Sequence, residues 1–560
     1  MSKSNDIGAR FDEIVQTYYR AWFRYHPEAA VDVGVPGYAH RLTPCAEEEK
    51  GALVCLNDEL LVALEEFDLA TLDPDRKADA EILVGAAQLE NEYLLDIEPH
   101  KPDPERCLPI NAIYQLTFRN VENFDEAMAE RLAAIPAHLS AAQLRLSANT
   151  RDIPVLWATS AAVSARAGVD FFKALAAHPK ITASAKRVSL TAQLEKAGES
   201  LARFSEFLSR GVVTEAKGSF ACGAEYFQQL LRRRHFLDVD SSRIHDFGQR
   251  LIERTRQELE AACQEVCGDR DLNRALRTIQ ARHPKSEQLL KVYTDTMRAA
   301  REFVAHKELV SLPSPERLDV IETPLFLRHQ IPFAAYCEPS PNDPAQVGYY
   351  YVTPPTSDAE LAEHDEIGLM HTCVHEAYPG HHLHFVTVNQ QPHARTLPRL
   401  LNASATSYEG WALYCEQLMQ EQGFLSKPES RVLLLRDRLW RANRVCIDVE
   451  LHTRGLSLDG AADRLVAALG FPKAQALADV TWYTRSPTVP LGYATGWALI
   501  NALRDRVFAA EPQGTLRSFH DRLLSAGAIS APLMMRRVFG ERTWRDVERT
   551  VFGEALDEAA

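Results

Sequence analysis

Apolar residues recur at every third or fourth position through most of the chain, which is the spacing of amphipathic helices. One such apolar face consists of Leu289, Tyr293, Met297, Ala300 and Val304. The stretches 241–267 and 125–149 show the same spacing. The pattern therefore predicts a mainly α-helical protein.

Residues 320–353 depart from this pattern. The segment is rich in β-branched and aromatic residues, contains several prolines and has the turn-like sequence PSPNDP in its middle. Such a composition predicts a β-hairpin or small sheet within a helical protein. We expect it to form a flap beside a cleft, where an edge strand can hold an extended peptide. A purely structural flap is the alternative.

The composition is that of an ordinary soluble globular protein. Of the 560 residues, 46% are hydrophobic and 25% are charged, which excludes a mostly disordered chain and a disulfide-dense secreted scaffold. The formal net charge of -15 gives an acidic surface that repels phosphate backbones. We therefore expect no nucleic-acid partner.

The cellular location is predicted from the N-terminus, the hydropathy and the cysteines. The first residues are polar, and no window approaches the ~18–20 apolar residues of a membrane span. The ten cysteines are scattered without the spacing of a zinc knuckle, as is typical of thiols in a reducing cytosol. These features predict a cytoplasmic protein with no membrane partner.

A short stretch of the chain carries many histidines and one adjacent carboxylate. Its members are His364, His371, His375, Glu376, His381, His382 and His384. Ser357 and Glu360 form a capping-box signature that predicts a helix start, and the pair at 379–380, Pro-Gly, predicts its end. Catalytic zinc sites combine three protein ligands with a water, and histidine is a common ligand. We therefore predict a metal site here.

The spacing of these histidines differs from the familiar H-E-x-x-H signature, in which the second His follows the first by four residues. Position 379 is proline, and His381 lies about 240° around and ~9 Å along an ideal helix from His375. The Pro-Gly pair can break the helix and return His381 towards His375. Two alternatives stay open: His371 and His375, four residues apart, form the pair, or the histidines only make a polar, solvated face.

The string HEAYPGHH at 375–382, followed by EGWALYCE at 409–416, resembles the family called domain of unknown function 885. The resemblance extends over most of the chain, including YHPEAAVDVGVPGY, YYYVTPP and FHDRLLSAGAISAPLMMRRV. Members of that family are similar in fold to the thermostable zinc carboxypeptidases. The resemblance implies a mainly α, gluzincin-like fold with a deep groove and a small sheet beside it.

For the domain organisation we expect two helical halves. Residues 1–220 would cover the cleft, and residues 221–560 would form the catalytic half. The catalytic half would include the β flap at 320–353 and the metal-site helices at 357–455.

The resemblance also implies a third ligand, because gluzincins take theirs from a glutamate on a later helix. Glu409 is the natural candidate, and Glu416 lies seven residues on, along the same helix face. Residues 406–409, Thr-Ser-Tyr-Glu, also match a capping box, so the alternative is that Glu409 only caps its helix. Glu416 would either support a ligand or lie as an acid at the edge of the core.

Arg444, Asp448 and His452 are spaced four residues apart and form one polar stripe on a predicted helix. Such a stripe can orient an imidazole, stabilise an oxyanion or hold a substrate carboxylate. A row of surface ion pairs worth a few tenths of a kcal/mol is the alternative. We include all three among the candidate catalytic residues.

Tyr483 and Tyr493 resemble family tyrosines near the cleft. A phenol can donate a hydrogen bond to a tetrahedral oxyanion, although an aromatic core position is the alternative for each. Where relatives carry Pro-Gly-Gln, this chain has Pro-Thr-Val at 487–489. Any substrate contact made by that glutamine is therefore missing here.

Together these features predict a Zn²⁺ site, with another divalent metal as an alternative. The expected ligands are His375, His381 and Glu409, and the alternative ligands are His371 and His382. Such a site leaves one coordination position for water.

The predicted enzyme is a metallopeptidase or related metal-dependent hydrolase that cleaves a peptide or small amide bond. Glu376 would act as the general base towards the water. One alternative is a metal-dependent hydrolase or lyase acting on a non-peptide metabolite. The other is a non-catalytic helical binding protein with a structural metal.

Overall fold

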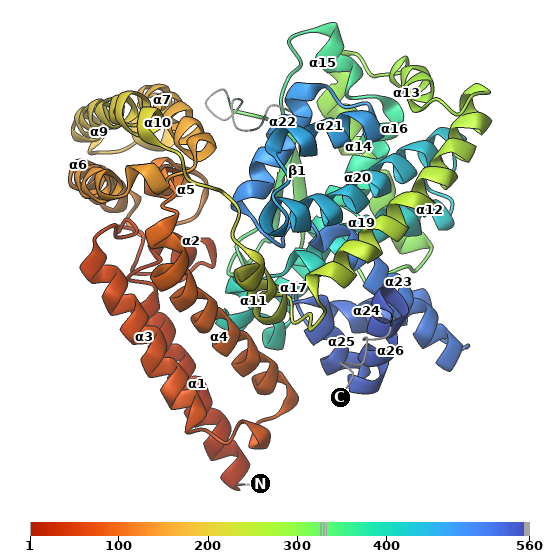
Figure 1. The fold of residues 1–560 in the computed structure, drawn as a ribbon, viewed down its shortest axis with the longest axis horizontal. Helices are drawn as coiled ribbons and strands as arrows, with labels where there is room; N and C mark the ends of the chain where they lie inside the picture. Colours follow the sequence, from red (N-terminus) through yellow and green to blue (C-terminus); the bar gives the residue numbers. More distant parts are fainter. Residues whose placement is uncertain (1, 325–327, 329–330, 332, 554–560) are drawn as a thin grey trace. The chain divides into compact units, whose positions relative to one another are not determined.

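The computed structural model describes residues 2–324, 328, 331 and 333–553 (Figure 1). Helices make up most of the described chain, and one three-stranded sheet accompanies them, so the predicted fold class is confirmed at this level. The chain divides into two compact units. Unit 1 comprises residues 1–220, 324–330 and 340–343, and unit 2 comprises residues 221–323, 331–339 and 344–560.

Unit 1 is helical. Its helices are α1 (Ser2–Trp22), α2 (Pro27–Asp32), α3 (Glu47–Glu65), α4 (Pro74–Glu92), α5 (Ile110–Phe118), α6 (Phe124–Ala148), α7 (Val155–Leu175), α8 (Pro179–Thr182), α9 (Arg187–Phe207) and α10 (Val213–Glu215). Helix α3 packs against both α1 and α4, and the three helices form a side-by-side group (Figure 1). Helices α6, α7 and α9 pack around a separate apolar core that includes Leu139, Phe172 and Leu201.

Unit 2 contains the remaining helices. They are α11 (Ala224–Arg234), α12 (Ser241–Cys267), α13 (Leu272–Gln280), α14 (Leu289–His306), α15 (Asp358–Ala362), α16 (Glu366–Glu376), α17 (His381–Gln390), α18 (Leu397–Leu401), α19 (Ala405–Glu421), α20 (Pro428–Thr453), α21 (Leu458–Leu469), α22 (Lys473–Arg485), α23 (Gly492–Ala510), α24 (Leu516–Leu524), α25 (Ala531–Phe539) and α26 (Glu541–Phe552). The apolar face predicted within α14 is buried, as expected.

Two close helix pairs organise unit 2: α12 packs along α20, and α19 packs along α23 (Figure 1). The second pair depends on glycines. A Cβ on Gly496 would lie 2.0 Å from the carbonyl oxygen of Thr406, and one on Gly410 would lie 2.6 Å from the Cα of Gly496. Larger residues at these positions would hold α19 and α23 apart, and α19 carries Glu409.

The sheet has the order β1-β3-β2, formed by β1 (Arg317–Glu322), β3 (Val347–Val352) and β2 (Ala334–Cys337). The predicted hairpin corresponds to β2 and β3, which pair antiparallel with Tyr336 opposite Tyr350. Strand β1 adds a parallel partner that the sequence pattern did not predict. Part of the predicted 320–353 flap, at 325–327, 329–330 and 332, lies outside the described residues.

The helix expected to begin at 357 and to continue through 378 is divided in two. Ser357 caps the short helix α15, as predicted, by accepting a hydrogen bond from the Glu360 N–H at 3.2 Å. Asp365 then starts α16, because its carboxylate accepts from the N–H groups of Ile367 and Gly368 at 3.0 and 2.7 Å. A second strong N-cap therefore ends the first helix early.

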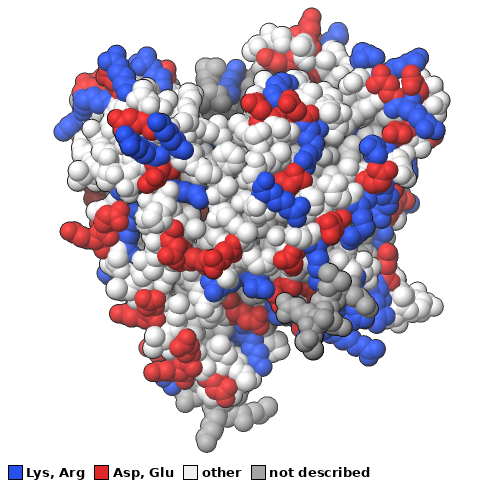
Figure 2. Space-filling view, in the orientation of Figure 1, with Lys and Arg blue, Asp and Glu red and all other residues white. Residues whose placement is uncertain are grey.

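Acidic and basic side chains are interspersed on the face of the molecule drawn in Figure 2. Among the helices of the described residues, none combines the length and the apolar character needed to cross a membrane.

Candidate functional site

The site begins with a break in the helical chain. Helix α16 ends at Glu376 and α17 begins at His381, so the Pro-Gly pair does interrupt the helix, as predicted. At Gly380 the chain passes so close to α16 that a Cβ would lie 1.8 Å from the carbonyl oxygen of His375. The indole N–H of Trp411, on α19, donates to the carbonyl of Pro379 at 2.8 Å. These contacts fix the break against the next helix.

This break brings His375 and His381 together. Their ring centroids are 4.8 Å apart, with the ring planes perpendicular. Glu409 Oε2 lies 3.5 Å from Nε2 of His375 and 3.3 Å from Nε2 of His381. The three side chains are only 9–13% exposed. The three residues that the sequence singled out as ligands therefore form one cluster, with one donor atom each within 4.8 Å of the others.

Glu409 does not serve as a helix cap. Ser404 is the N-cap of α19, and its hydroxyl accepts from the N–H of Thr406. Glu409 lies one turn into the helix, where its buried Oε2 has no hydrogen-bond partner. The capping alternative is thus excluded by the position of the carboxylate.

The separations within the cluster fit a metal ion. In a tetrahedral zinc site with ligand bonds of about 2.0–2.1 Å, neighbouring ligand atoms lie about 3.3 Å apart. The two Nε2-to-Oε2 distances, 3.5 and 3.3 Å, are close to that value and longer than a charge-assisted hydrogen bond. Two imidazoles and one carboxylate are also a donor set that zinc accepts. The residues present therefore fit the predicted ion.

Glu416 supports this arrangement from one side. The Nδ1 of His375 donates to Glu416 Oε1 at 2.7 Å, and Glu416 is buried. A carboxylate on the second ring nitrogen fixes the tautomer and turns Nε2 towards the cluster, as it does in many metal sites. Burial opposes protonation of His375, but contacts with Glu409 and Glu416 outweigh it and raise the pKa of His375 to about 10.

The other histidines have different surroundings. The Nε2 of His382 donates to Glu316 at 2.9 Å and its Nδ1 accepts from the Tyr336 hydroxyl at 3.1 Å, so both ring nitrogens are occupied away from the cluster. His364 is bonded to the Tyr293 hydroxyl at 3.0 Å. His384 is buried with its ring nearly parallel to that of Phe385. The structure thus selects His381, and not His382, as the neighbour of His375.

His371 does not join the cluster either. It is buried, and its Nδ1 lies 3.8 Å from Glu416 Oε2, too far for a hydrogen bond. Neither ring nitrogen has a partner among the described residues. The two members of the alternative pair, His371 and His375, therefore both lie near Glu416. Only His375 also lies near Glu409 and belongs to the cluster.

Glu376 lies at a cavity of about 710 Å³ within unit 2. His371, His375 and Glu416 also line it, together with side chains from α13, α20 and the segment 469–475. This volume is within the range of small-ligand sites. The carboxylate of Glu376 therefore lines a cavity that is large enough for a substrate.

The stripe of Arg444, Asp448 and His452 is buried and makes structural contacts, so it is not a surface ladder. Asp448 accepts from the N–H groups of Thr488 and Leu491, both at 3.2 Å. His452 accepts from the N–H of Cys222 at 3.3 Å and bonds to the Tyr483 carbonyl at 3.1 Å. Burial raises the pKa of Asp448 to about 8, against the opposing effect of those two N–H groups.

The two predicted tyrosines differ in what they contact. The hydroxyl of Tyr483 bonds to Asp479 and accepts from Arg444 Nε at 2.7 Å, which leaves it in a buried polar network. Tyr493 is the second residue of α23 and lies beside the cluster. Burial, and then the Glu409 carboxylate that its hydroxyl contacts, raise the pKa of Tyr493 well above its usual range.

Thr488 precedes Tyr493 in an unusual backbone conformation. Its φ is 68°, a left-handed value that a β-branched residue adopts at a cost of about 1–3 kcal/mol. The backbone N–H of Thr488 donates to Asp448, and the hydroxyl of Thr488 contacts Nε2 of the buried His235 at 3.0 Å. Asp448 therefore positions the turn that leads to Tyr493.

Several residues of the site were not predicted from the sequence. They are Trp411, which holds the helix break, Glu316, which occupies His382, and Arg441, which lines the cavity. For Arg441, the signal available was its position one helical turn before Arg444 on the same helix. Trp411 and Glu316 carried no such signal, because their partners lie far away in the sequence.

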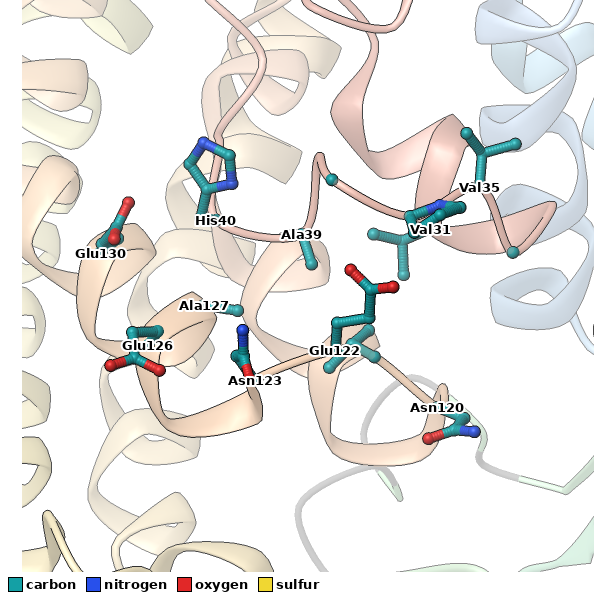
Figure 3. Close-up of a pocket in the computed structure, with 14 residues that line it drawn as sticks. Val31, Val35, Ala39, His40, Asn120, Glu122, Asn123, Glu126, Ala127 and Glu130 are labelled. Atoms are coloured by element: carbon teal, nitrogen blue, oxygen red, sulfur yellow. The ribbon is translucent and has the colours of Figure 1, made fainter.

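Unit 1 has a separate pocket of about 510 Å³ (Figure 3). The turn after α2 and the N-terminal part of α6 line it, with His40 from the former and Glu122, Glu126 and Glu130 from the latter region. These three carboxylates are exposed and His40 is half-buried. The pocket thus differs from the cluster in unit 2, whose polar groups are buried.

The fold and the site together define a mainly helical protein with a buried His-His-Glu cluster at a helix break. The chain belongs to the family described as "Bacterial protein of unknown function (DUF885)", whose model matches residues 27–538. No curated protein matches the sequence.

Two solved structures share the fold. A "putative lipoprotein of unknown function from Shewanella oneidensis" has a TM-score of 0.78 at 19% identity, over 94% of this chain and 99% of that one. A "putative lipoprotein from Colwellia psychrerythraea" has a TM-score of 0.79 at 18% identity, over 98% and 100%. Neither description refers to a zinc carboxypeptidase, so that implied likeness stays a prediction.

These comparisons correct the predicted location. Both structural neighbours are described as lipoproteins, which contradicts the prediction of a cytoplasmic protein. The prediction was wrong because scattered cysteines show only that the chain is not a disulfide scaffold. They do not identify a compartment.

Proposed function

We propose that this protein is a metal-dependent hydrolase that cleaves a peptide or small amide bond. His375, His381 and Glu409 would hold the ion, most simply Zn²⁺. One observation carries the proposal: the buried Glu409 Oε2 lacks a hydrogen-bond partner and lies 3.5 and 3.3 Å from two imidazole nitrogens. A buried carboxylate oxygen in that state calls for a cation.

A bound zinc ion supplies a Lewis acid and lowers the pKa of a water towards about 7. Glu376 faces the cavity directly after His375, so its carboxylate takes the proton from the attacking water. The same carboxylate then delivers that proton to the leaving nitrogen. Glu416 keeps Nε2 of His375 directed at the cluster throughout.

Tyr493 would contribute a phenolic O–H beside Glu409, because its raised pKa keeps the hydroxyl protonated. A neutral phenol is a suitable donor to an oxygen that gains negative charge as the carbonyl is attacked. Asp448 would act indirectly, since it holds the turn that precedes Tyr493. Tyr483 and His452 would take no part in the reaction, because their polar groups are hydrogen-bonded to other residues of the protein.

Metal analysis and a peptide digest together test the proposal. The purified wild type should carry about one equivalent of zinc or another divalent metal, whereas Glu409→Gln should lose most of it. Glu421→Gln, on the same helix but paired with Arg504 away from the cluster, is the matched control. Equal metal in all three proteins would show that the ligand assignment is wrong.

Glu376→Gln separates catalysis from metal binding. It should keep the metal and lose cleavage of a peptide mixture by about 10²–10⁴-fold, the usual contribution of a general base. Mass spectrometry of the digest gives the rate. Metal-loaded wild type that cleaves no peptide would overturn the peptidase assignment, and unchanged cleavage by Glu376→Gln would overturn the role of Glu376.

A further inference from the structure

We infer that the cavity beside the His-His-Glu cluster recognises a carboxylate group of the substrate, and that Arg441 is the residue that binds it. The inference rests on the proposed function, because the bound carboxylate would belong to the molecule that is hydrolysed. It adds a substrate class and a specificity residue to that function.

Arg441 is a buried cation whose hydrogen-bond donors are not all satisfied. It is 8% exposed, and its Nε and Nη1 have no hydrogen-bond partner although both atoms are buried. The nearest carboxylate, Asp437 Oδ2, lies 3.8 Å from Nη1, which is too long for a hydrogen bond. A buried guanidinium in this state is costly unless something else satisfies it.

Asp437 makes its short contacts with another arginine through its other oxygen, so only the longer ion pair from Oδ2 reaches Arg441. Nε and Nη2 of Arg436 lie 2.9 and 2.8 Å from Oδ1 of Asp437. The next arginine along the helix, Arg444, is by contrast fully engaged, with Asp479 at 3.0 Å and the Tyr483 hydroxyl at 2.7 Å. Of Arg441 and Arg444, only Arg441 lacks hydrogen-bond partners, and only Arg441 lines the cavity.

The guanidinium of Arg441 is also held in place. Its Cζ lies 4.2 Å from the centroid of the Trp440 ring, and Trp440 is itself fixed by a hydrogen bond to Asp479 at 2.7 Å. Stacking of this kind limits the motion of the side chain and uses none of its N–H groups. Arg441 is thus preorganised for a planar anion.

The charges around the cavity favour a carboxylate over a phosphate. Five carboxylates line the same cavity, against three arginines, so its lining is net negative: Glu363, Asp365, Glu376, Glu416 and Asp437, with Arg277, Arg436 and Arg441. This lining would repel a doubly charged phosphate more strongly than a singly charged group. A guanidinium fork and a carboxylate also match in a bidentate geometry. The carboxylate is either a peptide C-terminus or an acidic side chain.

Three peptide probes distinguish these sources: N-acetyl-tetraalanine with a free carboxylate, its C-terminal amide, and the amide with aspartate as the last residue. Binding is measured by calorimetry on metal-loaded Glu376→Gln, which should not turn over. A free C-terminus is recognised if only the first probe binds tightly, and an acidic side chain if only the third does. Equal binding of all three probes, or no binding of any, would overturn the inference.

The second arm tests Arg441 itself. Arg441→Met, made in the same background, should weaken the binding of the recognised carboxylate probe 10–100-fold and leave the neutral amide unchanged. Arg441→Lys should recover part of the loss. Arg431→Met, an exposed arginine on the same helix, is the control and should change neither probe. An Arg441→Met variant that loses both probes equally, or neither, would contradict the assignment.

Kinetics separate this inference from the proposed function. In the active enzyme, Arg441→Met should raise KM for the carboxylate probe with a smaller effect on kcat, because the contact is made equally in the ground and transition states. Carboxylate-dependent binding without any cleavage would sink the hydrolase proposal alone. Cleavage with the same preference in wild type and Arg441→Met would sink only the inference.

Discussion

Five histidines lie on α16 and α17, and their hydrogen-bond partners give them different roles. Glu416 takes Nδ1 of His375 and leaves Nε2 directed at Glu409. Glu316 and Tyr336 occupy both nitrogens of His382, the residue directly after His381. The partner of each imidazole, and not its place in the HEAYPGHH string, decides whether it can bind a metal.

Asp448 permits a prediction about pH. Its pKa of about 8 lies above the value of about 3.9 expected in the unfolded chain. Between these values the folded chain binds more protons than the unfolded one, so this residue's contribution to stability falls as pH rises from about 4 to 8, by up to ~1.4 kcal/mol per pH unit. Asp448→Asn should abolish this dependence.

The measurement is the Tm of wild type minus that of Asp448→Asn at pH 5, 6, 7 and 8. This difference should fall steadily as pH rises, because only the wild type loses stability through residue 448. Asp505→Asn, a change at an exposed position on α23, should give a difference that does not vary with pH. Parallel Tm curves for wild type and Asp448→Asn would show that the carboxylate is already ionised in the folded protein.

Whole helices were predicted best where the apolar spacing is local. Helix α12 has the predicted bounds, and α14 buries the predicted face. The sequence was less informative where the bounds or pairing of an element depend on a partner far away in the chain or on a second helix cap. Strand β1 joins the sheet through a parallel pairing, and Asp365 divides the helix expected at 357–378.

The candidate site, too, was predicted in part from the sequence and in part only from the folded structure. Spacing and family resemblance placed His375, His381 and Glu409 in one site, and the structure brings these three together. The choice between His381 and His382 needed the position of Glu316, which comes from another segment. Arg441 was missed because only the folded cavity shows that its N–H groups lack partners.

The break between α16 and α17 should depend on glycine at 380. A Cβ there would lie 1.8 Å from a backbone carbonyl of α16, so Gly380→Ala cannot keep this close approach. The variant should move His381 away from His375 and weaken metal binding by at least 100-fold, since one of three ligands is lost. Metal titration of the purified variant, with circular dichroism to verify its helix content, gives the result.

Gly51→Ala is the control, because a Cβ at Gly51 of α3 meets no atom within 4 Å. This exposed helical position should tolerate alanine, with a gain of about 0.5–1 kcal/mol in stability. Wild-type metal affinity in a folded Gly380→Ala would show that the tight turn at 380 does not position His381.

The two units have separate apolar cores, and all three cluster residues lie in unit 2. The family match, residues 27–538, nevertheless extends over both units, and each solved neighbour covers more than nine-tenths of the chain. Both units are therefore parts of one recurring fold, although the proposed chemistry is confined to the second.

This confinement leads to a prediction for metal removal. A ligand that binds only the folded state stabilises it by about 2.7 kcal/mol at a concentration 100 times its Kd. Because local opening follows local stability, a chelator should speed amide hydrogen exchange mainly in α16, α17 and α19. Exchange in α6, α7 and α9 of unit 1 should change little, because none of the cluster residues lies there.

Hydrogen exchange followed by mass spectrometry, with and without the chelator, measures both regions in one experiment. Glu409→Gln supplies the internal reference, because its exchange should already be fast in α16, α17 and α19 and should not respond further to the chelator. A uniform response across both units would mean that the chain opens as one cooperative body. No response in either unit, in a protein shown to contain the metal, would place the ion outside the His-His-Glu cluster.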